Sequence, residues 1–452
     1  MNPLDRDILE SAEVAARPTP ATEPVREDDE AGYVAIPAAS SGLAEAAETF
    51  RLPHYGRLWT SNVVQFVCFQ VLFLAMQWLV TSMTPLRSAV GLIGFVQGGT
   101  IALASPMAGV LVDRRAKRDL ITIGRIGLAT ISIAVGTLAF SGAIAYWQIV
   151  VFSVLGGLLT SVLSPATQTF VVDVVGRRRT HHAISLNAVG ASFGMMGGGA
   201  LGGFLLGAAG VFPTFLMAGL GVVLSAIVVR SIPVAGRSLA SAEAGATASS
   251  PLADLREGFA YVRARPPLLL ALLACAMAVF NGALNPMRIF FARDVLDVGA
   301  EGLGWMAGVN GVGTLAAAVL AILRPPQRHL GILIAGTMLA FATGLVLYSF
   351  AFSFGWVLGV EGWLGFTGQL WNISALIGFQ LAVPEAMRGR VLSMVFTLAQ
   401  LGFLGVLGVG ALADLVGDQT ALFVFGAIPT VLLTGLLVFG WRTLEAMQEA
   451  DA

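Results

Sequence analysis

Two residues of opposite charge, Arg288 and Glu361, lie inside long apolar segments of this 452-residue chain. A charge within hydrocarbon is costly, so such residues usually pair with each other or face water. At a helical rise of about 1.5 Å per residue they lie at similar depths, roughly 6 Å and roughly 9 Å below the same side of the membrane. We therefore predict an ion pair. It would be either a structural bridge or a switch in which protonation of Glu361 releases Arg288.

Eight of the amide side chains inside the apolar segments are candidates for contact with a solute. Three of them, Asn62, Gln70 and Gln77, occupy about 80° of arc on one helix at about 100° per residue, so one face of that helix is polar. For any single amide, a hydrogen bond between helices is as reasonable as contact with a solute. As a set they are predicted to line a substrate cavity: Asn62, Gln70, Gln77, Gln168, Asn281, Asn285, Gln369 and Asn372.

Many apolar side chains accompany these amides, among them Phe66, Phe69 and Phe73. An apolar cavity with few charges favours a small amphipathic or hydrophobic solute over a sugar or a phosphate ester. Helices that face lipid are apolar whatever they carry, so the composition agrees with this solute class without requiring it.

The elements that must position these residues are membrane-spanning helices. The chain is 56% hydrophobic and 12% charged, unlike an average soluble domain. Apolar runs of about 20 residues, enough to cross a bilayer, recur between Gly56 and Trp441. Backbone groups in lipid must be satisfied internally, so these runs predict an all-α membrane protein. Twelve spans are expected, at residues 57–82, 88–112, 119–141, 144–173, 183–208, 211–230, 267–292, 301–323, 329–351, 355–383, 390–414 and 419–441.

These spans form two six-helix halves, residues 51–230 and 267–441. Gly91-Leu92 matches Gly302-Leu303 at an offset of 211 positions, and the same offset relates residues 199–201 to residues 410–412. Such parallel repeats are typical of transporters with a substrate site between the halves. The remaining segments are a disordered cytoplasmic tail over residues 1–50, a cytoplasmic linker over residues 231–266 with a surface helix near Pro251–Val262, and a cytoplasmic C-terminus over residues 442–452.

Basic residues lie almost entirely in every second loop. They are retained on the cytoplasmic side of a membrane. With a cytoplasmic N-terminus, the inside loops contain Arg114–Arg118, Arg177–Arg179 and Arg388–Arg390, whereas the outside segments contain little beyond Arg87 and Arg293. We therefore predict a multi-pass protein of the cytoplasmic membrane with both termini in the cytoplasm.

Several function classes are excluded or disfavoured. The chain has one lysine, Lys117, and no phosphate-binding G-x-x-x-x-G-K-[ST] loop around it, so an ATP motor within this chain is excluded. The histidines lack metal-ligand spacing and no hydrolase motif is present, so neither an enzyme, a metal site nor a cofactor is expected. A net charge near zero suggests no nucleic-acid partner. The expected partners are a small-molecule substrate, the lipid bilayer and, if transport is ion-coupled, protons; we expect a monomer.

The loop after the second span contains a motif of known families. Residues 109–118 read Gly-Val-Leu-Val-Asp-Arg-Arg-Ala-Lys-Arg, which resembles the G-x-L-x-D-R-x-x-R-[RK] motif of the major facilitator superfamily. The resemblance implies that a conformational latch on the cytoplasmic side is formed by Gly109, Asp113, Arg114 and Arg118. An ordinary positively charged inside loop would explain the arginines but not the glycine and aspartate at this spacing. The resemblance also implies that the first, fourth, seventh and tenth helices line the cavity.

The fifth span contains glycines every four residues, Gly194, Gly198 and Gly202, a pattern typical of close helix packing. Residues 198–203 also resemble the glycine-rich antiporter motif of exporters, although Gly199 replaces its usual proline. Residues 382–393, 291–296 and 183–187 are similar to the enterobactin-exporter and macrolide-efflux-like branch. The sequence thus predicts a secondary active exporter working by alternating access; an importer of the same fold, or a membrane sensor or assembly partner that transports nothing, remains the alternative.

Overall fold

The computed structural model describes residues 48–448 except residues 53, 177–179, 237–250, 325 and 327–328. Among the described residues there are helices and no strands, which confirms the all-α class. Most of the predicted tail, residues 1–47, lies outside the described part. Its last residues, 48–50, belong to the folded part: they are helical, Thr49 is buried, and the Phe50 ring packs edge-on against Tyr55 and Trp59. The boundary expected at residue 51 therefore falls too late, because Phe50 covers apolar surface on the first span.

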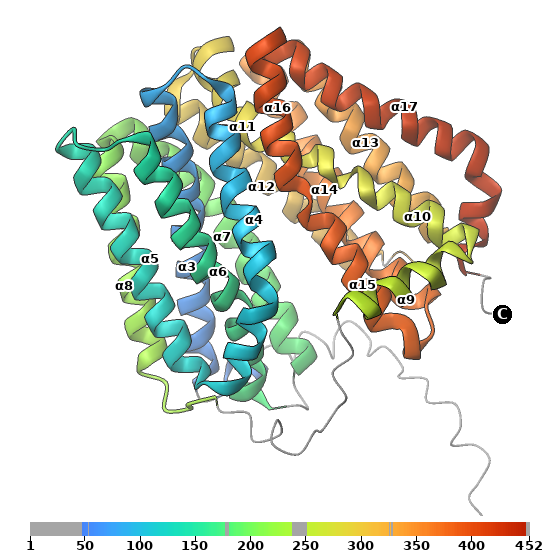
Figure 1. Cartoon of the computed structure of the whole chain (residues 1–452), viewed down its shortest axis with the longest axis horizontal. Coiled ribbons are helices and arrows are strands. Elements are labelled where there is room, and N and C mark those ends of the chain that lie inside the picture. Colours follow the sequence, from blue (N-terminus) through green and yellow to red (C-terminus); the bar gives the residue numbers. More distant parts are fainter. Residues whose placement is uncertain are drawn as a thin grey trace, which may run out of the picture. The chain divides into compact units, whose positions relative to one another are not determined.

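Six long helices form the N-terminal half, and their ends lie within a few residues of the predicted spans. They are α3 (Tyr55–Met83), α4 (Arg87–Arg114), α5 (Lys117–Phe140), α6 (Tyr146–Val175), α7 (Thr180–Ala209) and α8 (Val211–Arg230). Helix α3 packs against α7 and α8, and α5 packs against α6 and α8 (Figure 1). We call the end of the bundle at Arg87 the outer end and the end at Arg114 the inner end.

The C-terminal half follows a short helix, α9 (Pro251–Arg263), in the predicted position of the surface helix. Helix α9 packs on α15, and Glu257 and Arg390 form an ion pair at 2.8 Å between them. The half consists of α10 (Pro266–Ala276), η4 (Met277–Ala283), α11 (Leu284–Phe290), η5 (Phe291–Val295), α12 (Gly299–Leu323), α13 (Leu330–Phe350), α14 (Phe354–Ala382), α15 (Glu385–Gln400), α16 (Gly402–Val416), α17 (Asp418–Glu445) and η6 (Ala446–Gln448).

The predicted span at residues 267–292 is present as one helical stretch, Pro266–Val295, that is not α-helical throughout, whereas the span expected at residues 390–414 is divided between α15 and α16. The first changes to a 3₁₀ segment at Met277–Ala283, and the second breaks at Leu401. The breaks lie against each other, since a side chain on Gly282 would meet the Gly402 carbonyl. Pro286 adds to the first break because it has no N–H to donate to the preceding turn. Both segments therefore depart from regular α-helix where Gly282 and Gly402 lie in close contact.

Ten helices within the described part are long and apolar enough to cross a membrane. Helix α14 is 29 residues long but is not among them, and α15 and α16 divide the eleventh predicted span into two shorter pieces. The polar residues of α14, including Glu361, Gln369 and Asn372, lower its apolarity. The count of twelve crossings therefore stays a prediction.

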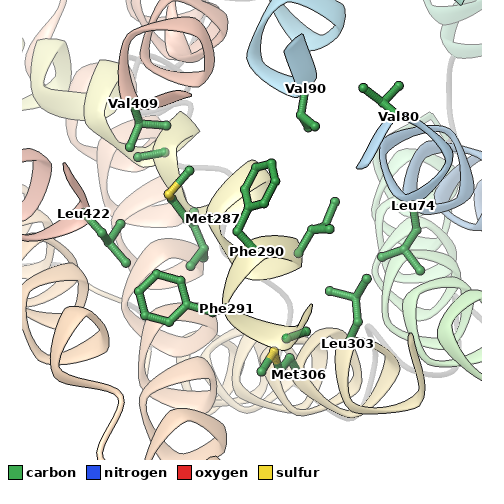
Figure 2. Packing of buried hydrophobic residues seen from close by; sticks show 14 of the residues in the cluster. Leu74, Val80, Val90, Met287, Phe290, Phe291, Leu303, Met306, Val409 and Leu422 are labelled. Carbon is green, nitrogen blue, oxygen red and sulfur yellow. The ribbon is translucent and has the colours of Figure 1, made fainter. Parts of the chain in front are cut away.

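One buried apolar cluster joins the two halves, and it lies toward the outer end. It includes Leu74, Val80 and Val90 from the N-terminal half, and Figure 2 shows them facing Met287, Phe290 and other side chains of the C-terminal half. The other clusters of buried residues each lie within a single half. Burial of apolar surface stabilises a contact in proportion to the area buried. This cluster therefore stabilises the contact between the halves at the outer end.

Candidate functional site

A cavity of about 650 Å³ lies between the halves. Residues of α3 and α4 form one wall, and residues of η4, α11, α14, α15 and α16 form the other; its polar residues include Gln77, Gln97, Ser105, Asn281, Asn285 and Thr397. An adjoining cavity of about 280 Å³ shares Asn281 and Asn285 and is also lined by Gln70, Arg288, Asn310 and Gln369. Polar groups from segments far apart in the sequence thus converge on one space.

Five of the eight predicted amides line these two cavities: Gln70, Gln77, Asn281, Asn285 and Gln369. The other three do not. Gln168 and Asn372 are exposed outside them, and Asn62 is buried between helices, where its side-chain amide donates to Asn187 Oδ1 at 3.0 Å. Periodicity identified the polar face of α3 but could not tell which of its amides meets another helix.

Packing between the halves extends from the outer end to about the middle of the bundle, where a side chain on Gly98 of α4 would meet Phe403 and one on Gly311 of α12 would meet Met196. A side chain on Gly91 of α4 would meet the Val406 carbonyl of α16 at 2.8 Å, and one on Gly203 of α7 would meet the backbone of Gly304 in α12. Toward the inner end of α4, by contrast, Leu103 is 83% exposed and Met107 is 78% exposed. The two halves therefore part at the inner end, and the cavity between them opens toward the side predicted to be cytoplasmic.

A cluster of charges spans the two halves at the outer end. Asp414 of α16 accepts the first backbone N–H groups of α4, from Arg87 at 2.7 Å and Ser88 at 3.0 Å. The Arg87 guanidinium makes a bidentate pair with Asp418, both bonds being 3.0 Å, and reaches Asp294 at 2.9 Å. Carboxylates stabilise helix N-termini, and bidentate pairs are the stronger kind of ion pair. We call these residues the outer clamp.

A second link crosses between the halves nearby, because the Arg293 guanidinium donates to the Thr81 carbonyl at the end of α3. In the sequence, Arg87 and Arg293 stood out only as exceptions to the charge rule, and Asp414 and Asp418 were not predicted to have a role. A signal was available, since residues 410–414 repeat the G-x-L-x-D spacing of residues 109–113.

Loss of the outer clamp is expected to open the outer end. In Arg87→Gln the bidentate pair is lost while α4 keeps its Asp414 cap, so the fraction of molecules open at the outer end should rise about three- to ten-fold, and less at high salt. The measurement is labelling of Val90→Cys, a position now buried between the halves, by a membrane-impermeant thiol reagent added from outside. Arg442→Gln, at an exposed inner position of α17, is the control. Equal labelling in the two backgrounds would show that the clamp does not hold this end.

Arg288 and Glu361 are brought together, at the wall of the smaller cavity. Arg288 Nε and Nη2 donate to the two Glu361 oxygens at 2.6 and 2.7 Å. The carboxylate also accepts from the Tyr348 hydroxyl at 3.1 Å and from the Asn310 amide at 3.0 Å. Glu361 is fully buried, whereas Arg288 contributes to the cavity lining. The ion pair therefore lies between the packed core of the C-terminal half and the space where a solute would bind.

The four residues of the predicted latch lie at the inner end, where the halves are apart. A side chain added to Gly109 would meet nothing within 4 Å, and Arg114 is exposed. Arg118 donates to the Ile232 carbonyl at 3.2 Å, within the N-terminal half. The Asp113 side chain is outside the described part. The neighbouring Lys117, which stands where the motif has its second arginine, pairs with Asp173 at 2.7 Å.

The predicted glycine face of α7 packs against α3. A side chain on Gly194 would meet Phe66, one on Gly198 would meet the Val67 carbonyl at 2.6 Å, and one on Gly202 would meet Val71 Cα at 3.2 Å. The neighbouring glycines Gly199 and Gly203 face α12 instead. Helix α7 therefore uses one set of glycines within its half and another at the contact between the halves.

Arg125 of α5 is a buried charge that was not predicted from the sequence. Its guanidinium donates to Ser61 Oγ, to Asn62 Oδ1 at 2.7 Å and to the hydroxyl and carbonyl oxygens of Ser225 at 3.0 and 3.3 Å. All of these partners are neutral, and no carboxylate among the described residues pairs with Arg125. Its position inside the third apolar run was the available signal.

Comparison with known proteins agrees with this architecture. The chain is 24% identical over 352 residues to the uncharacterized MFS-type transporter YfiS of Bacillus subtilis (strain 168), covering 75% of this chain and 80% of that protein. It is 24% identical over 355 residues to the enterobactin exporter EntS of Shigella flexneri, with the same coverage of both chains.

Solved structures share the fold. A D-xylose-proton symporter aligns with a TM-score of 0.67 at 14% identity, over 88% of this chain and 99% of that one. A bacterial homologue of the human lysosomal transporter Spinster aligns with a TM-score of 0.66 at 14% identity, over 88% and 98%. Residues 58–405 match the sequence profile of the Major Facilitator Superfamily. The protein is therefore a multi-pass membrane transporter that belongs to the major facilitator superfamily.

Proposed function

We propose that the protein is a secondary active exporter of a small amphipathic or hydrophobic solute, which it moves by alternating access. The observation that carries the proposal is the amide-lined cavity between two halves that pack together at one end and part at the other. Its walls combine aromatic rings such as Phe69 and Phe73 with uncharged amides, which favours a solute with apolar and polar parts. The similarity to enterobactin exporters supports export over import.

Flux measurements test this proposal. Inverted membrane vesicles containing the protein should accumulate at least one member of a panel of macrolides, siderophores and lipophilic cations, and the same solute should move in proteoliposomes. Uptake only in right-side-out vesicles would support the importer. Absence of flux with every solute, despite folded protein, would favour a sensor or an assembly partner.

The inner gate is the second part of the proposal. In the outward-open state the halves would close at the inner end, and Asp113, as part of the latch with Gly109, Arg114 and Arg118, would hold them by charge-assisted hydrogen bonds. Asp113→Asn should keep the fold but shift the population toward the inward-open state and lower transport several-fold. Transport at the normal rate in this variant would eliminate the latch.

The Arg288–Glu361 pair suits coupling of transport to protons. Protonation of Glu361 would remove the charge that holds Arg288, and Arg288 already borders the smaller cavity. A freed guanidinium could then contact solute or water in that cavity, so that the proton and the solute would affect each other's binding. The alternative is a structural bridge with no role in coupling, and gradient-driven flux separates the two.

A further inference from the structure

A small chamber opens from the central cavity into the N-terminal half. It has a volume of about 80 Å³ and is enclosed by residues of α3, α4, α5, α6 and α8. It shares with the central cavity the residues Phe69, Phe73, Gln77, Gly94 and Gln97. A space of this size holds a few waters or one small chemical group, so it suits one part of a solute whose remainder lies in the central cavity.

Four phenylalanine rings contribute to the apolar wall of the chamber, beside five aliphatic side chains. Phe69 and Phe73 are stacked with ring centroids 6.4 Å apart and an interplanar angle of 16°, and Phe152 and Phe215 lie on other sides. Aromatic surfaces favour a ring that can pack offset or edge-on against them. The shape and lining therefore favour an aromatic group over a flexible alkyl chain.

Gln77 gives the chamber an unused hydrogen-bond acceptor. Its side chain is more than nine-tenths buried, and its Oε1 atom has no hydrogen-bond partner within the described part of the chain. The Ser132 and Ser153 hydroxyls, also in the wall, donate their hydrogens to the carbonyls of Phe215 and Ile149 and so have only acceptor capacity left. A buried acceptor without a donor costs free energy, and a ligand O–H or N–H group would remove that cost.

The charge near the chamber favours a neutral hydrogen-bond donor over a cationic one. Among the described residues that line it, none carries a charge. The nearest connected charge is Arg125, which donates to Ser225 Oγ at 3.0 Å; this hydroxyl in turn donates at 3.2 Å to Oε1 of Gln65, a lining residue. Because no described carboxylate offsets Arg125, its positive charge disfavours an ammonium group in the chamber.

We propose that this chamber is a subsite for a phenolic group of the transported solute, with the ring packed against the phenylalanines of the wall and the hydroxyl donating to Gln77 Oε1. This inference rests on the proposed function and defines the solute class further: an amphipathic molecule that carries an aromatic hydroxyl.

Three probes of similar shape test the proposal on the purified full-length protein: 1-naphthol, 1-methoxynaphthalene and 1-naphthylmethylamine, the last being cationic at neutral pH. Equilibrium dialysis measures the dissociation constants, with protein-free samples correcting for partition into detergent. The wild type should bind 1-naphthol most tightly. In Gln77→Leu the affinity for 1-naphthol should fall about two- to ten-fold, the loss expected for one neutral hydrogen bond, whereas the methyl ether should bind as well as before.

Gly156→Val provides an independent variant. A side chain at Gly156 has room, since its nearest neighbour would be Gln97 Nε2 at 3.8 Å, and it would occupy part of the chamber. This variant should weaken binding of all three probes at an unchanged unfolding temperature. Tightest binding of the amine would overturn the proposal, and so would an equal loss of naphthol and methyl ether in Gln77→Leu.

The outcome is separable from that of the flux assay. Flux of panel solutes without an effect of Gln77 on naphthol binding would overturn the subsite and leave the exporter. Binding that depends on Gln77 in a protein that moves no solute would establish the chamber and overturn the exporter.

Discussion

Glu361→Gln is expected to destabilise the protein by about 3–5 kcal/mol, the cost of leaving a buried charge without its partner. Glutamine has nearly the size of glutamate, so little volume is lost. Its side-chain amide, however, offers one accepting oxygen where the carboxylate accepts hydrogen bonds at both oxygens from Arg288, Tyr348 and Asn310. Arg288 would remain charged in a site that is nearly closed to solvent.

A double-mutant cycle measures the pairing. Arg288→Gln alone should also be strongly destabilising, whereas the double variant Arg288→Gln, Glu361→Gln should be more stable than the sum of the single changes predicts, because no unpaired charge remains. Unfolding in detergent gives the free energies. Glu257→Gln makes the same substitution in the more exposed pair with Arg390 and should cost less than about 1 kcal/mol. If the losses of unfolding free energy in the two single variants add up to the loss in the double variant, Arg288 and Glu361 are not coupled.

The Glu361→Gln variant also distinguishes a structural bridge from a proton-coupled switch. If protonation of Glu361 couples transport to the proton gradient, Glu361→Gln should still bind solute and exchange it down a concentration gradient, but should not accumulate it when a proton gradient is imposed. Gradient-driven accumulation that survives in this variant would leave the ion pair with a structural role only.

Gly203→Val is expected to lower transport about five-fold or more by preventing closure of the outer end. The new side chain would collide with the backbone of Gly304, which cannot move without shifting α12. Overpacking of this kind costs about 1–3 kcal/mol, and because it acts only where the halves meet, the cost falls on the state described here and not on the fold of either half. A penalty of this size changes a two-state population by about 5- to 150-fold.

Spin labels report that shift directly. Leu86 and Leu415 are exposed at the outer ends of the two halves, so the distance between labels at these positions should lengthen in Gly203→Val. The matched control is Gly197→Val on the same helix, where a side chain would meet nothing within 4 Å; its label distance and flux should equal those of the wild type. An unchanged distance in Gly203→Val would show that the contact between α7 and α12 does not govern closure.

Helix positions and membrane class were predictable because they depend on local properties. An apolar run of sufficient length must form a helix in lipid, whatever surrounds it. The predicted span at residues 211–230 therefore agrees with α8, and the span at residues 301–323 is close to α12. Arg288 and Glu361 were identifiable on the same ground, since a charge in an apolar run needs a partner wherever it lies.

The destination of each polar side chain required the tertiary structure. Helical periodicity shows that Asn62 and Gln77 share a face of α3, yet Asn62 bonds to α7 while Gln77 borders the cavities. The outer clamp joins Arg87 to Asp418, more than 300 positions away in the chain. These contacts depend on which helices are neighbours and on the end at which the halves are closed. Free energies of packing between distant segments decide both, and no local pattern in the sequence contains that information.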